Sequence, residues 1–368
     1  MNAIRASLVL SALFLTRAAE AIAGTTWYVS GVNGTDSNSC KSPQAACKTI
    51  GHAISLAASG DSIRVAAATY TENIVIGVSL NVIGAGASTT IIDGGRAGSV
   101  VAVYNTGSIV GIANVTIRNG FANGYGGGVF NEGILTINSS TISGNEAFTR
   151  GWGWGGGISN FGALTINNST LSGNIASCGA FACNAGGGGI NNGGVTLTIN
   201  NSTLAGNSTL GHFGSAEGGA ILSSGVLTIN NSTIVGNTAG FSNGIAGHGG
   251  GIYGHAILQN SILANNTAAN CYGPVTSSFS LSSDNSCNLN GPGDLSNVNP
   301  KLGTLGNYGG PTQTIPLLSG SPAIDAGNPS GCTDYQGHLL TTDQRGNPRP
   351  DREDTGGCDM GAYESQSD

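Results

Sequence analysis

Five successive segments of this chain repeat one short pattern, and the repetition constrains the fold more than any other feature of the sequence. Each segment opens with glycines and one aliphatic residue, continues with a short apolar run and ends in an asparagine-containing turn. A nearly fixed period of this size is typical of a solenoid, in which similar coils stack on one another. The aligned aliphatic residues, at steps of 29, 32, 31 and 31 residues, are Val129, Ile158, Ile190, Ile221 and Ile252.

The apolar runs inside the repeats alternate as they do in a β-strand. Leu135 and Ile137 fall on one face of an extended chain, and Thr136 falls on the other. Each repeat has room for about three short strands separated by Gly and Asn-Ser-Thr turns, and the repeats show no helical pattern. The sequence therefore predicts an all-β protein, a single parallel β-helix that rises roughly 4.8 Å per coil. The alternation recurs at Leu164/Ile166, Leu197/Ile199 and Leu227/Ile229.

Charged residues make up only 8% of the chain, which suits stacked coils. Each side chain in such a stack lies over its equivalent, so a charged strand position would be repelled by its own copies. Asparagine recurs instead at one bend of the repeat. We expect these amides to form a hydrogen-bonded ladder, on residues that take the left-handed backbone asparagine tolerates. They are Asn138, Asn167, Asn200 and Asn230.

The N-terminus has the features of a secretory signal peptide, predicted at residues 1–23. Arg5 precedes the apolar residues 6–15, and the stretch ends in small residues.

An exported chain with an even number of cysteines is expected to form disulfides. No Cys-x-x-Cys pair or nearby histidine cluster indicates a metal site. The eight cysteines fall into close pairs, Cys40/Cys47, Cys178/Cys183, Cys271/Cys287 and Cys332/Cys358.

The rest of the chain divides into three stretches. Residues 24–60 are expected to form an N-terminal cap, in which residues 48–58 carry apolar positions at helical spacing. A short amphipathic helix there would cover the open end of the first coil. Residues 61–270 form the β-helix coils, and residues 271–368 form the last coils and an irregular C-terminal cap.

Charge and hydropathy narrow the choice of partners. A net charge of −7 without a basic patch argues against nucleic acid. No later apolar run approaches the roughly 18 residues of a membrane span, so none is predicted. We predict no cofactor; the one alternative is calcium at residues 351–354 and Asp359, where alternating charges and nearby Cys358 favour local pairing instead. We expect a monomer that is secreted or held at the cell surface.

Parts of the sequence resemble families of exported proteins. The repeats, with Gly-Gly-Gly-Ile and Leu-Ser-Gly-Asn, resemble the GGA[ILV] and FxxN repeats of chlamydial polymorphic outer-membrane proteins, with an aliphatic residue in place of Phe. Gly-Asp-Ser-Ile-Arg-Val at 60–65, followed by Tyr-Thr-Glu at 70–72, is similar to the first coil of pectate-lyase-like right-handed β-helix proteins. The close of the chain resembles the choice-of-anchor Q domain of bacterial surface proteins, at residues 305–312, 321–327, 343–350 and 359–364.

These resemblances imply a right-handed β-helix and export, and no particular reaction. The chain has neither the Arg-x-Pro-x-x-Arg pattern of pectate lyases nor the Gly-x-x-Asp-Phe-Ile-Phe-Gly block of pectinesterases. Catalytic residues of those families therefore have no counterparts to which they can be assigned here.

One column of residues departs from the Asn and Gly pattern, four positions before each aligned aliphatic residue. Aromatic rings interspersed with polar groups are typical of a saccharide site, because sugar C–H faces stack on rings and hydroxyls seek polar partners. The alternative is that the rings merely cover loop backbone. The column contains Tyr125, Trp154, Gly186, Glu217 and His248, and the same variable loops also hold Trp152, His212 and Phe213.

Four residues near this column are candidates for catalysis. Glu217 and His248 are at the same offset on neighbouring coils, about 5 Å apart at the backbone, where they could share a proton. Arg150 could neutralise a uronate carboxylate, and Tyr253 or His255 could supply a second proton donor for β-elimination. The alternative for each of these groups is that it is simply solvated.

Glycoside hydrolysis is less favoured than elimination. It needs two carboxylates about 5 to 5.5 Å apart for retention of configuration, or about 6.5 to 9.5 Å apart for inversion. Glu132 and Glu217 would be separated by roughly 14 Å, and Glu146 and Glu217 by roughly 10 Å. The sequence thus predicts a secreted β-helix protein that binds an extracellular polysaccharide, with cleavage by a lyase reaction left open. The alternative is a non-enzymatic cell-surface or adhesion protein.

Overall fold

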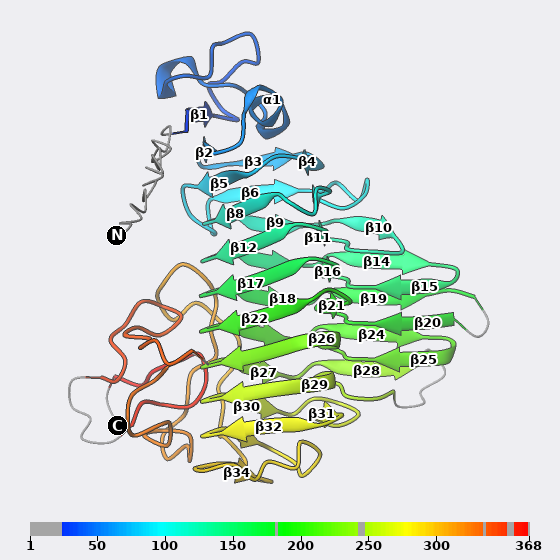
Figure 1. Cartoon of the computed structure of the whole chain (residues 1–368), viewed down its shortest axis with the longest axis vertical. Helices are drawn as coiled ribbons and strands as arrows, with labels where there is room; N and C mark the ends of the chain where they lie inside the picture. Colours follow the sequence, from blue (N-terminus) through cyan, green and yellow to red (C-terminus); the bar gives the residue numbers. More distant parts are fainter. Residues whose placement is uncertain (1–23, 181–182, 242–246, 334–335, 352–356, 367–368) are drawn as a thin grey trace, which may run out of the picture.

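The computed structural model describes residues 24–180, 183–241, 247–333, 336–351 and 357–366, and it shows a right-handed parallel β-solenoid (Figure 1). The predicted signal peptide and the side chain of Phe213 lie outside the described part. Equivalent strands of successive coils pair in parallel and in register; Leu135, for example, pairs with Leu164, which pairs with Leu197. The predicted fold class and the vertical stacking of the repeats are therefore confirmed.

Two ladders of strands form one sheet because β26 (Ile221–Asn230) and β29 (Ile252–Gln259) are long enough to belong to both. The first ladder contains β1 (Thr26–Val29), β2 (Asp61–Val65), β5 (Leu80–Gly84), β8 (Ile109–Ala113), β12 (Ile134–Asn138), β17 (Ala163–Asn167), β22 (Thr196–Asn200) and β32 (Val275–Ser278). The second contains β4 (Ile74–Ile76), β7 (Val101–Val103), β11 (Val129–Asn131), β16 (Ile158–Asn160), β21 (Ile190–Asn192) and β31 (Cys271–Tyr272).

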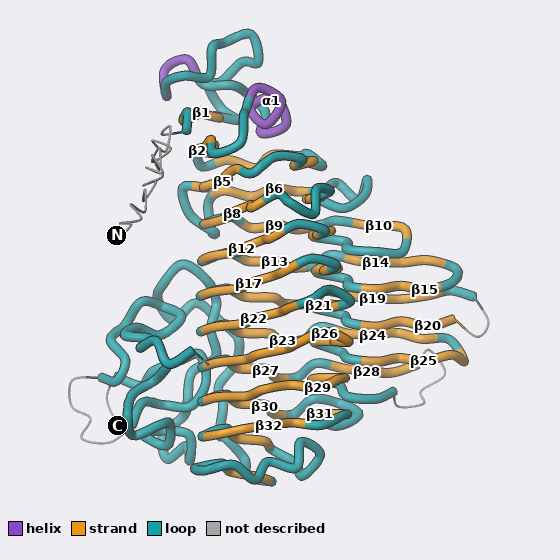
Figure 2. Tube along the Cα trace, viewed as in Figure 1, coloured by secondary structure: helices purple, strands orange, loops and turns teal. Residues whose placement is uncertain are grey.

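A ten-stranded sheet closes the coil on its other side (Figure 2). It contains β3 (Ala68–Thr71), β6 (Thr90–Asp93), β9 (Thr116–Arg118), β13 (Thr141–Ser143), β18 (Thr170–Ser172), β23 (Thr203–Ala205), β27 (Thr233–Val235), β30 (Ile262–Ala264), β33 (Leu281–Ser282) and β34 (Leu295–Ser296). The apolar side chains of all three ladders point inward and form one continuous core along the solenoid.

Two further sheets project sideways from the middle coils, at the right of Figure 1, and we call them the projection. The segments expected to be variable loops are thus partly strands. The two sheets pack through side chains as small as those of Ala147, Ala185 and Ala216, which are fully buried, and this makes the projection thin. Its strands are β10 (Phe121–Asn123), β14 (Glu146–Thr149), β19 (Ile175–Cys178), β24 (Ser208–Gly211) and β28 (Thr238–Phe241) in one sheet, and β15 (Trp152–Trp154), β20 (Cys183–Gly186) and β25 (Phe213–Glu217) in the other.

The predicted asparagine ladder is present, with one correction. The Asn167 amide donates to Asn138 Oδ1 at 2.8 Å, and the Asn200 amide donates to Asn167 Oδ1 at 2.9 Å. The left-handed residue is the next one along, Asn168 with φ 49° and Asn201 with φ 44°. The ladder residues themselves end a strand, so their extended backbone leaves the bend to the residue that follows.

The sequence reading missed two further ladders in the interior. Asn174 is fully buried, and its amide donates to Asn207 Oδ1 and to the Ile142 carbonyl oxygen, both at 2.9 Å. Each amide thereby satisfies its neighbour and a backbone carbonyl in a place water does not reach. The two ladders are Asn145, Asn174, Asn207, Asn237, Asn266 and Asn270, and Asn131, Asn160, Asn192 and Ser223.

A helix covers the N-terminal end of the core, as predicted. Helix α1 (Ile50–Leu56) follows a 3₁₀ turn, η1 (Pro43–Ala45), and buries Ile50 and Ala53 against the first coils. The Glu72 carboxylate accepts hydrogen bonds from the first two amides of the helix, which lack partners within the helix itself. All four predicted disulfide pairs are formed.

The C-terminal residues differ from the expected cap. The Cys271–Cys287 disulfide and Leu289 join the core at the last coils. The described residues of the range 300–366, which we call the C-terminal segment, lie along the outer face of the ten-stranded sheet, beside the lower half of the solenoid in Figure 1. Gln344 is central to this contact, because its amide donates to Ser169 and Thr170 and its oxygen accepts from the Thr203 hydroxyl.

A buried ion pair fixes the end of the C-terminal segment. Arg349 Nε lies 2.7 Å from Glu364 Oε2, and both side chains are fully buried. The same guanidinium donates to Asn201 Oδ1 on the solenoid at 3.0 Å.

Of the residues considered for calcium, 352–354 lie outside the described part, and Asp359 accepts hydrogen bonds from the amides of Asp325 and Ser365. Among the described residues, no helix is long and apolar enough to cross a membrane.

Candidate functional site

The structure brings the predicted column together at the base of the projection. Tyr125 pairs with Trp154, Trp154 with Gly186, Gly186 with Glu217 and Glu217 with His248, each on the neighbouring coil. All five residues immediately precede a glycine whose left-handed backbone, such as Gly155 at φ 67°, turns the chain into the core strands.

Aromatic side chains that follow the glycine turn lie on the same surface as the column that precedes it. Tyr253 pairs with Leu222 on the coil before it and with Tyr272 on the coil after it. The Tyr125 and Phe161 ring centroids lie 5.6 Å apart, and those of His248 and Tyr272 lie 4.6 Å apart. These contacts show that residues before the glycine turn and residues after it form one surface. We call it the aromatic strip, formed by Tyr104, Tyr125, Phe130, Trp154, Phe161, His248, Tyr253 and Tyr272.

The upper part of the aromatic strip is a chain of rings. Tyr104 lies 5.5 Å from Phe130, and Phe130 lies 5.6 Å from Phe161, between ring centroids. Tyr104 is 55% exposed and Phe161 is 41% exposed, so these rings present faces or edges to solvent. The sequence reading missed these three residues and Tyr272. A signal existed for Phe130 alone, which directly follows an aligned aliphatic residue, as Tyr253 does.

The middle of the aromatic strip depends on a glycine. A Cβ atom on Gly186 would lie 2.4 Å from Trp154 Cζ3 and 2.4 Å from Leu222 Cδ2. Gly186 thus leaves the space that both side chains occupy. Trp154 is half-buried there, and the Ser159 hydroxyl donates to its carbonyl oxygen at 2.7 Å. The glycine in the predicted column therefore leaves room for the tryptophan ring.

The lower part of the aromatic strip holds the candidate proton-transfer groups. Glu217 and His248 are adjacent in register, yet among the described residues no hydrogen bond joins their side chains. His248 packs instead on Tyr272, which stacks on Tyr253 at 5.0 Å and an interplanar angle of 12°. Burial, then the charges of Glu217 and Tyr272, raise the pKa of Tyr253. Its hydroxyl therefore stays protonated at neutral pH.

The remaining predicted residues lie outside the aromatic strip. Trp152 is 60% exposed on β15, two residues further out than Trp154, and Arg150 is exposed in the turn before it. Strand geometry places the Arg150 backbone roughly 16 Å from that of Glu217, too far for direct contact. His212 immediately precedes β25 and forms a backbone bridge to Cys183.

His255 faces another part of the surface. It is exposed at the end of the coil turn in β29 and lines a hollow of about 550 Å³ together with Val195 and Val226. Glu146, considered for hydrolysis, lies on the other sheet of the projection and forms an ion pair with Arg96 at 2.8 Å. It does not form a carboxylate pair with Glu217.

Comparisons with known proteins find likeness to solved structures alone, at low identity. No family model and no curated protein matches the chain. Among solved structures, pectate lyase Pel9A is 18% identical with a TM-score of 0.42, covering 92% of this chain and 96% of its own. Pectin methylesterase PemA from Erwinia chrysanthemi is 16% identical with a TM-score of 0.36, covering 70% and 89%. The class established here is the right-handed parallel β-solenoid, and it rests on the strand pairing alone.

Proposed function

We propose that this chain is an exported protein that binds an extended extracellular polysaccharide along the aromatic strip. The observation that carries the proposal is the alignment in register of two groups of rings, Tyr104, Phe130, Phe161 and Tyr125 in one and His248, Tyr253 and Tyr272 in the other. Gly186 and Glu217 occupy the two coils that separate the groups. Tyr104 and Tyr272 mark the two ends of the aromatic strip. Between them the paired strands run through β7, β11, β16, β21, β26, β29 and β31. Six steps of the strand spacing amount to roughly 29 Å, a length that suits a polymer better than a small ligand.

The chemistry of the aromatic strip suits sugars. Tyrosine and tryptophan offer a flat apolar face together with a polar edge, which matches the alternating C–H and hydroxyl character of a saccharide. Glu217 and His248 add polar atoms that have no hydrogen-bonded side-chain partner among the described residues. An aromatic surface that merely covered backbone would leave neither an exposed Tyr104, at 55%, nor an exposed Tyr272, at 49%.

Export is supported by the four disulfides, which persist in oxidising compartments. The predicted signal peptide and the resemblance of the C-terminal segment to choice-of-anchor Q domains point the same way. The resemblance of the repeats to polymorphic outer-membrane proteins also belongs to this proposal. We place the protein outside the cell or at its surface, as a monomer.

Cleavage by β-elimination is a second candidate, and one observation favours it. Tyr253, a protonated hydroxyl, lies close enough to Glu217 for the carboxylate to affect its pKa. Tyr253 would donate the proton to the leaving oxygen, and Glu217 or His248 would remove the proton from the sugar ring. Arg150 would act only at a sugar further along the polymer, because of its distance from Glu217. Binding is the better supported function, since Glu217 and His248 are not hydrogen-bonded to each other.

The test is a panel of neutral and acidic plant, algal and animal polysaccharides, offered to the mature protein in pull-down and calorimetric assays. We expect binding to one of these classes, weakened about tenfold or more by Trp154→Ala and by Tyr272→Ala. Phe148→Ala, which removes a ring from the opposite sheet of the projection, should leave binding unchanged. Binding to no glycan would remove the proposal and leave the adhesion alternative, with a protein partner.

Cleavage is tested in the same mixtures by the ultraviolet absorbance of unsaturated products. Product that disappears in Tyr253→Phe while binding persists would establish the lyase. Binding without product on every polysaccharide that binds would exclude it.

A further inference from the structure

A column of threonines runs along the outer face of the ten-stranded sheet, far from the aromatic strip in the fold. The threonine column contains Thr116, Thr141, Thr170, Thr203 and Thr233, paired in register on successive coils. The C-terminal segment covers its lower part and bonds to each hydroxyl there. Thr170 donates to the Gln313 carbonyl and Thr203 to Gln344 Oε1, both at 2.6 Å, and Thr233 accepts from the Ala362 amide.

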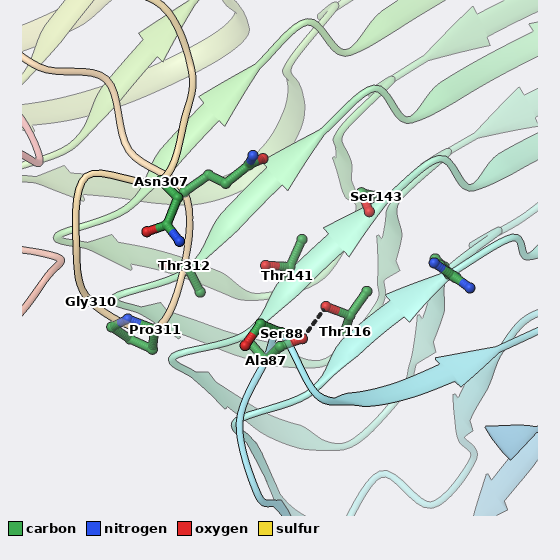
Figure 3. A pocket seen from close by; sticks show the side chains of 11 residues that line it. Ala87, Ser88, Thr116, Thr141, Ser143, Asn307, Gly310, Pro311 and Thr312 are labelled. Atoms are coloured by element: carbon green, nitrogen blue, oxygen red, sulfur yellow. Dashed lines mark hydrogen bonds between the residues drawn. The ribbon is translucent and has the colours of Figure 1, made fainter. Parts of the chain in front are cut away.

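A pocket of about 320 Å³ lies where this coverage stops (Figure 3). Asn307, Pro311 and Thr312 of the C-terminal segment form one wall and face Thr116 and Thr141 on the sheet. The Thr116 hydroxyl donates to the Ala87 carbonyl at 2.6 Å. Of the threonine column, Thr141 is the member whose hydroxyl has no hydrogen-bond partner among the described residues, and it faces the pocket.

The other lining groups are polar and ready to pair. Ser88 and Ser143 also have hydroxyls without a protein partner in the described part of the chain. The Arg118 side chain is 40% exposed; its Nε donates to Asp93 Oδ2 at 2.9 Å, which leaves its terminal nitrogens as donors. Because the Asp93 carboxylate balances the guanidinium, the pocket has donors and acceptors without a net charge of its own.

We infer that this pocket binds a neutral saccharide unit, at a site separate from the aromatic strip. Three hydroxyls, a charge-balanced guanidinium and the Asn307 amide match a ligand that carries several hydroxyls and no charge. The Pro311 ring supplies one apolar surface against which a sugar C–H face packs. The volume is at the lower end of the range for small-molecule sites, which fits one or two sugar rings and not a long polymer.

The inference stands apart from the proposed function, because the two sites are on different sheets. The aromatic strip would hold a polymer by its length, whereas this pocket would take a single unit, such as a chain end or a branch. If the protein binds no polysaccharide along the aromatic strip, binding of a sugar unit in the pocket can still be measured, and the reverse also holds.

The test uses saturation-transfer NMR on the mature full-length protein with the methyl glycosides of glucose, galactose, mannose and xylose, and with galacturonate as the charged comparison. We expect at least one neutral glycoside to bind, and Thr141→Val, which keeps the shape and removes the hydroxyl, to weaken it about tenfold. Arg118→Met should have a similar effect. Thr165→Val, a matched change on the outward face of β17, should have none.

Two outcomes would overturn the inference. One is that no neutral glycoside binds, or that binding is the same in Thr141→Val as in the parent protein. The other is that galacturonate binds more tightly than every neutral sugar and loses affinity in Arg118→Met, which would make the pocket an anion site. Trp154→Ala serves as a further control, because it removes one ring of the aromatic strip and should leave glycoside binding to the pocket intact.

Discussion

The ring of Trp154 lies over Gly186 of the next coil, in the space that a side chain at position 186 would fill. Gly186 in turn pairs with Glu217 on the following coil. A missing side chain on one coil therefore positions an aromatic ring from another. The relationship exists only because the coils stack in register, and it makes Gly186 a determinant of the surface without contact to a ligand.

Gly186→Val should displace the Trp154 ring. A Cβ at this position would come within 2.4 Å of Trp154 Cζ3 and of Leu222 Cδ2, so one of the two side chains must move. We expect the free energy of unfolding to fall by about 1–3 kcal/mol and polysaccharide affinity to fall as in Trp154→Ala. Calorimetry and urea denaturation measure the two effects. Gly77→Ala, where the added atom meets open space, is the matched control and should be nearly neutral. An unaltered affinity in Gly186→Val would show that the tryptophan position is irrelevant.

Asn174→Ala should destabilise the solenoid far more than Asn167→Ala. Asn174 is fully buried, and its removal leaves a new cavity. The backbone and side-chain amides of Asn145 lose the acceptor Asn174 Oδ1, and the Ile142 carbonyl loses the Asn174 side-chain donor. We expect a loss of about 2–4 kcal/mol. Asn167 lies in the half-buried outer ladder, where water can replace the lost amide, so its loss should be about 1 kcal/mol. Equal losses in urea denaturation would contradict the distinction between inner and outer ladders.

Stability should fall as the pH rises from about 5 to about 8. Burial raises the pKa of Asp359 to about 6 and that of Glu364 to about 8. A carboxyl whose pKa is raised by folding favours the folded state at low pH, and that contribution is lost as the pH rises through the raised value. Melting curves across this range should therefore shift to lower temperature with rising pH. The described aspartates whose pKa is lowered, because hydrogen bonds outweigh burial, titrate below this window: Asp36, Asp61, Asp93 and Asp284.

Glu364→Gln is the variant that checks this assignment. It removes one of the two titrating groups, so the slope of melting temperature against pH should become smaller, although the variant is less stable overall. A slope identical to that of the parent protein would place the pH dependence elsewhere.

Arg349→Met should release the C-terminal segment. The change leaves Glu364 buried without its cation and removes the donor to Asn201 Oδ1 on the solenoid. Breaking a buried ion pair on one side costs about 3–5 kcal/mol. Because Glu364 is more fully protonated at pH 5 than at pH 8, the loss should be smaller at the lower pH. Limited proteolysis, followed by mass spectrometry of the released fragment, measures the exposure of residues 300–366. Unchanged resistance at pH 8 would show that other contacts suffice to hold the segment.

The repeat period made the coils predictable, because Val129, Ile158 and Ile190 are each buried at the same point of a coil. The strands of the projection were read as loops, since alanines and glycines such as Ala185 and Gly153 carry no apolar alternation. They form strands because two sheets meet there at very short distance, which only small residues allow.

Part of the aromatic strip could be predicted from the sequence, because residues at equal offsets in the repeat lie next to one another on stacked coils. Tyr125 and Trp154 share an offset from the aligned residues, so their proximity follows from the period. Phe161 and Tyr104 each lie three residues after a paired aliphatic residue, but Glu132 occupies this position on the coil between them. No run of aromatic residues at this offset therefore marks them in the sequence. The C-terminal segment has no period at all, and its place on the threonine column depends on individual contacts such as those of Gln344.

Fluorescence tests the central claim most directly, because the chain has three tryptophans, of which Trp27 is buried and Trp152 is replaceable. In a Trp152→Phe variant, Trp154 is the one tryptophan on the exposed side of the projection. Oligosaccharides of increasing length, cut from the polysaccharide that binds best, are titrated against this variant. We predict a saturable change in tryptophan emission and an affinity that rises with the number of sugar units until the length of the aromatic strip is reached. An emission that never changes, or an affinity independent of length, would contradict the account.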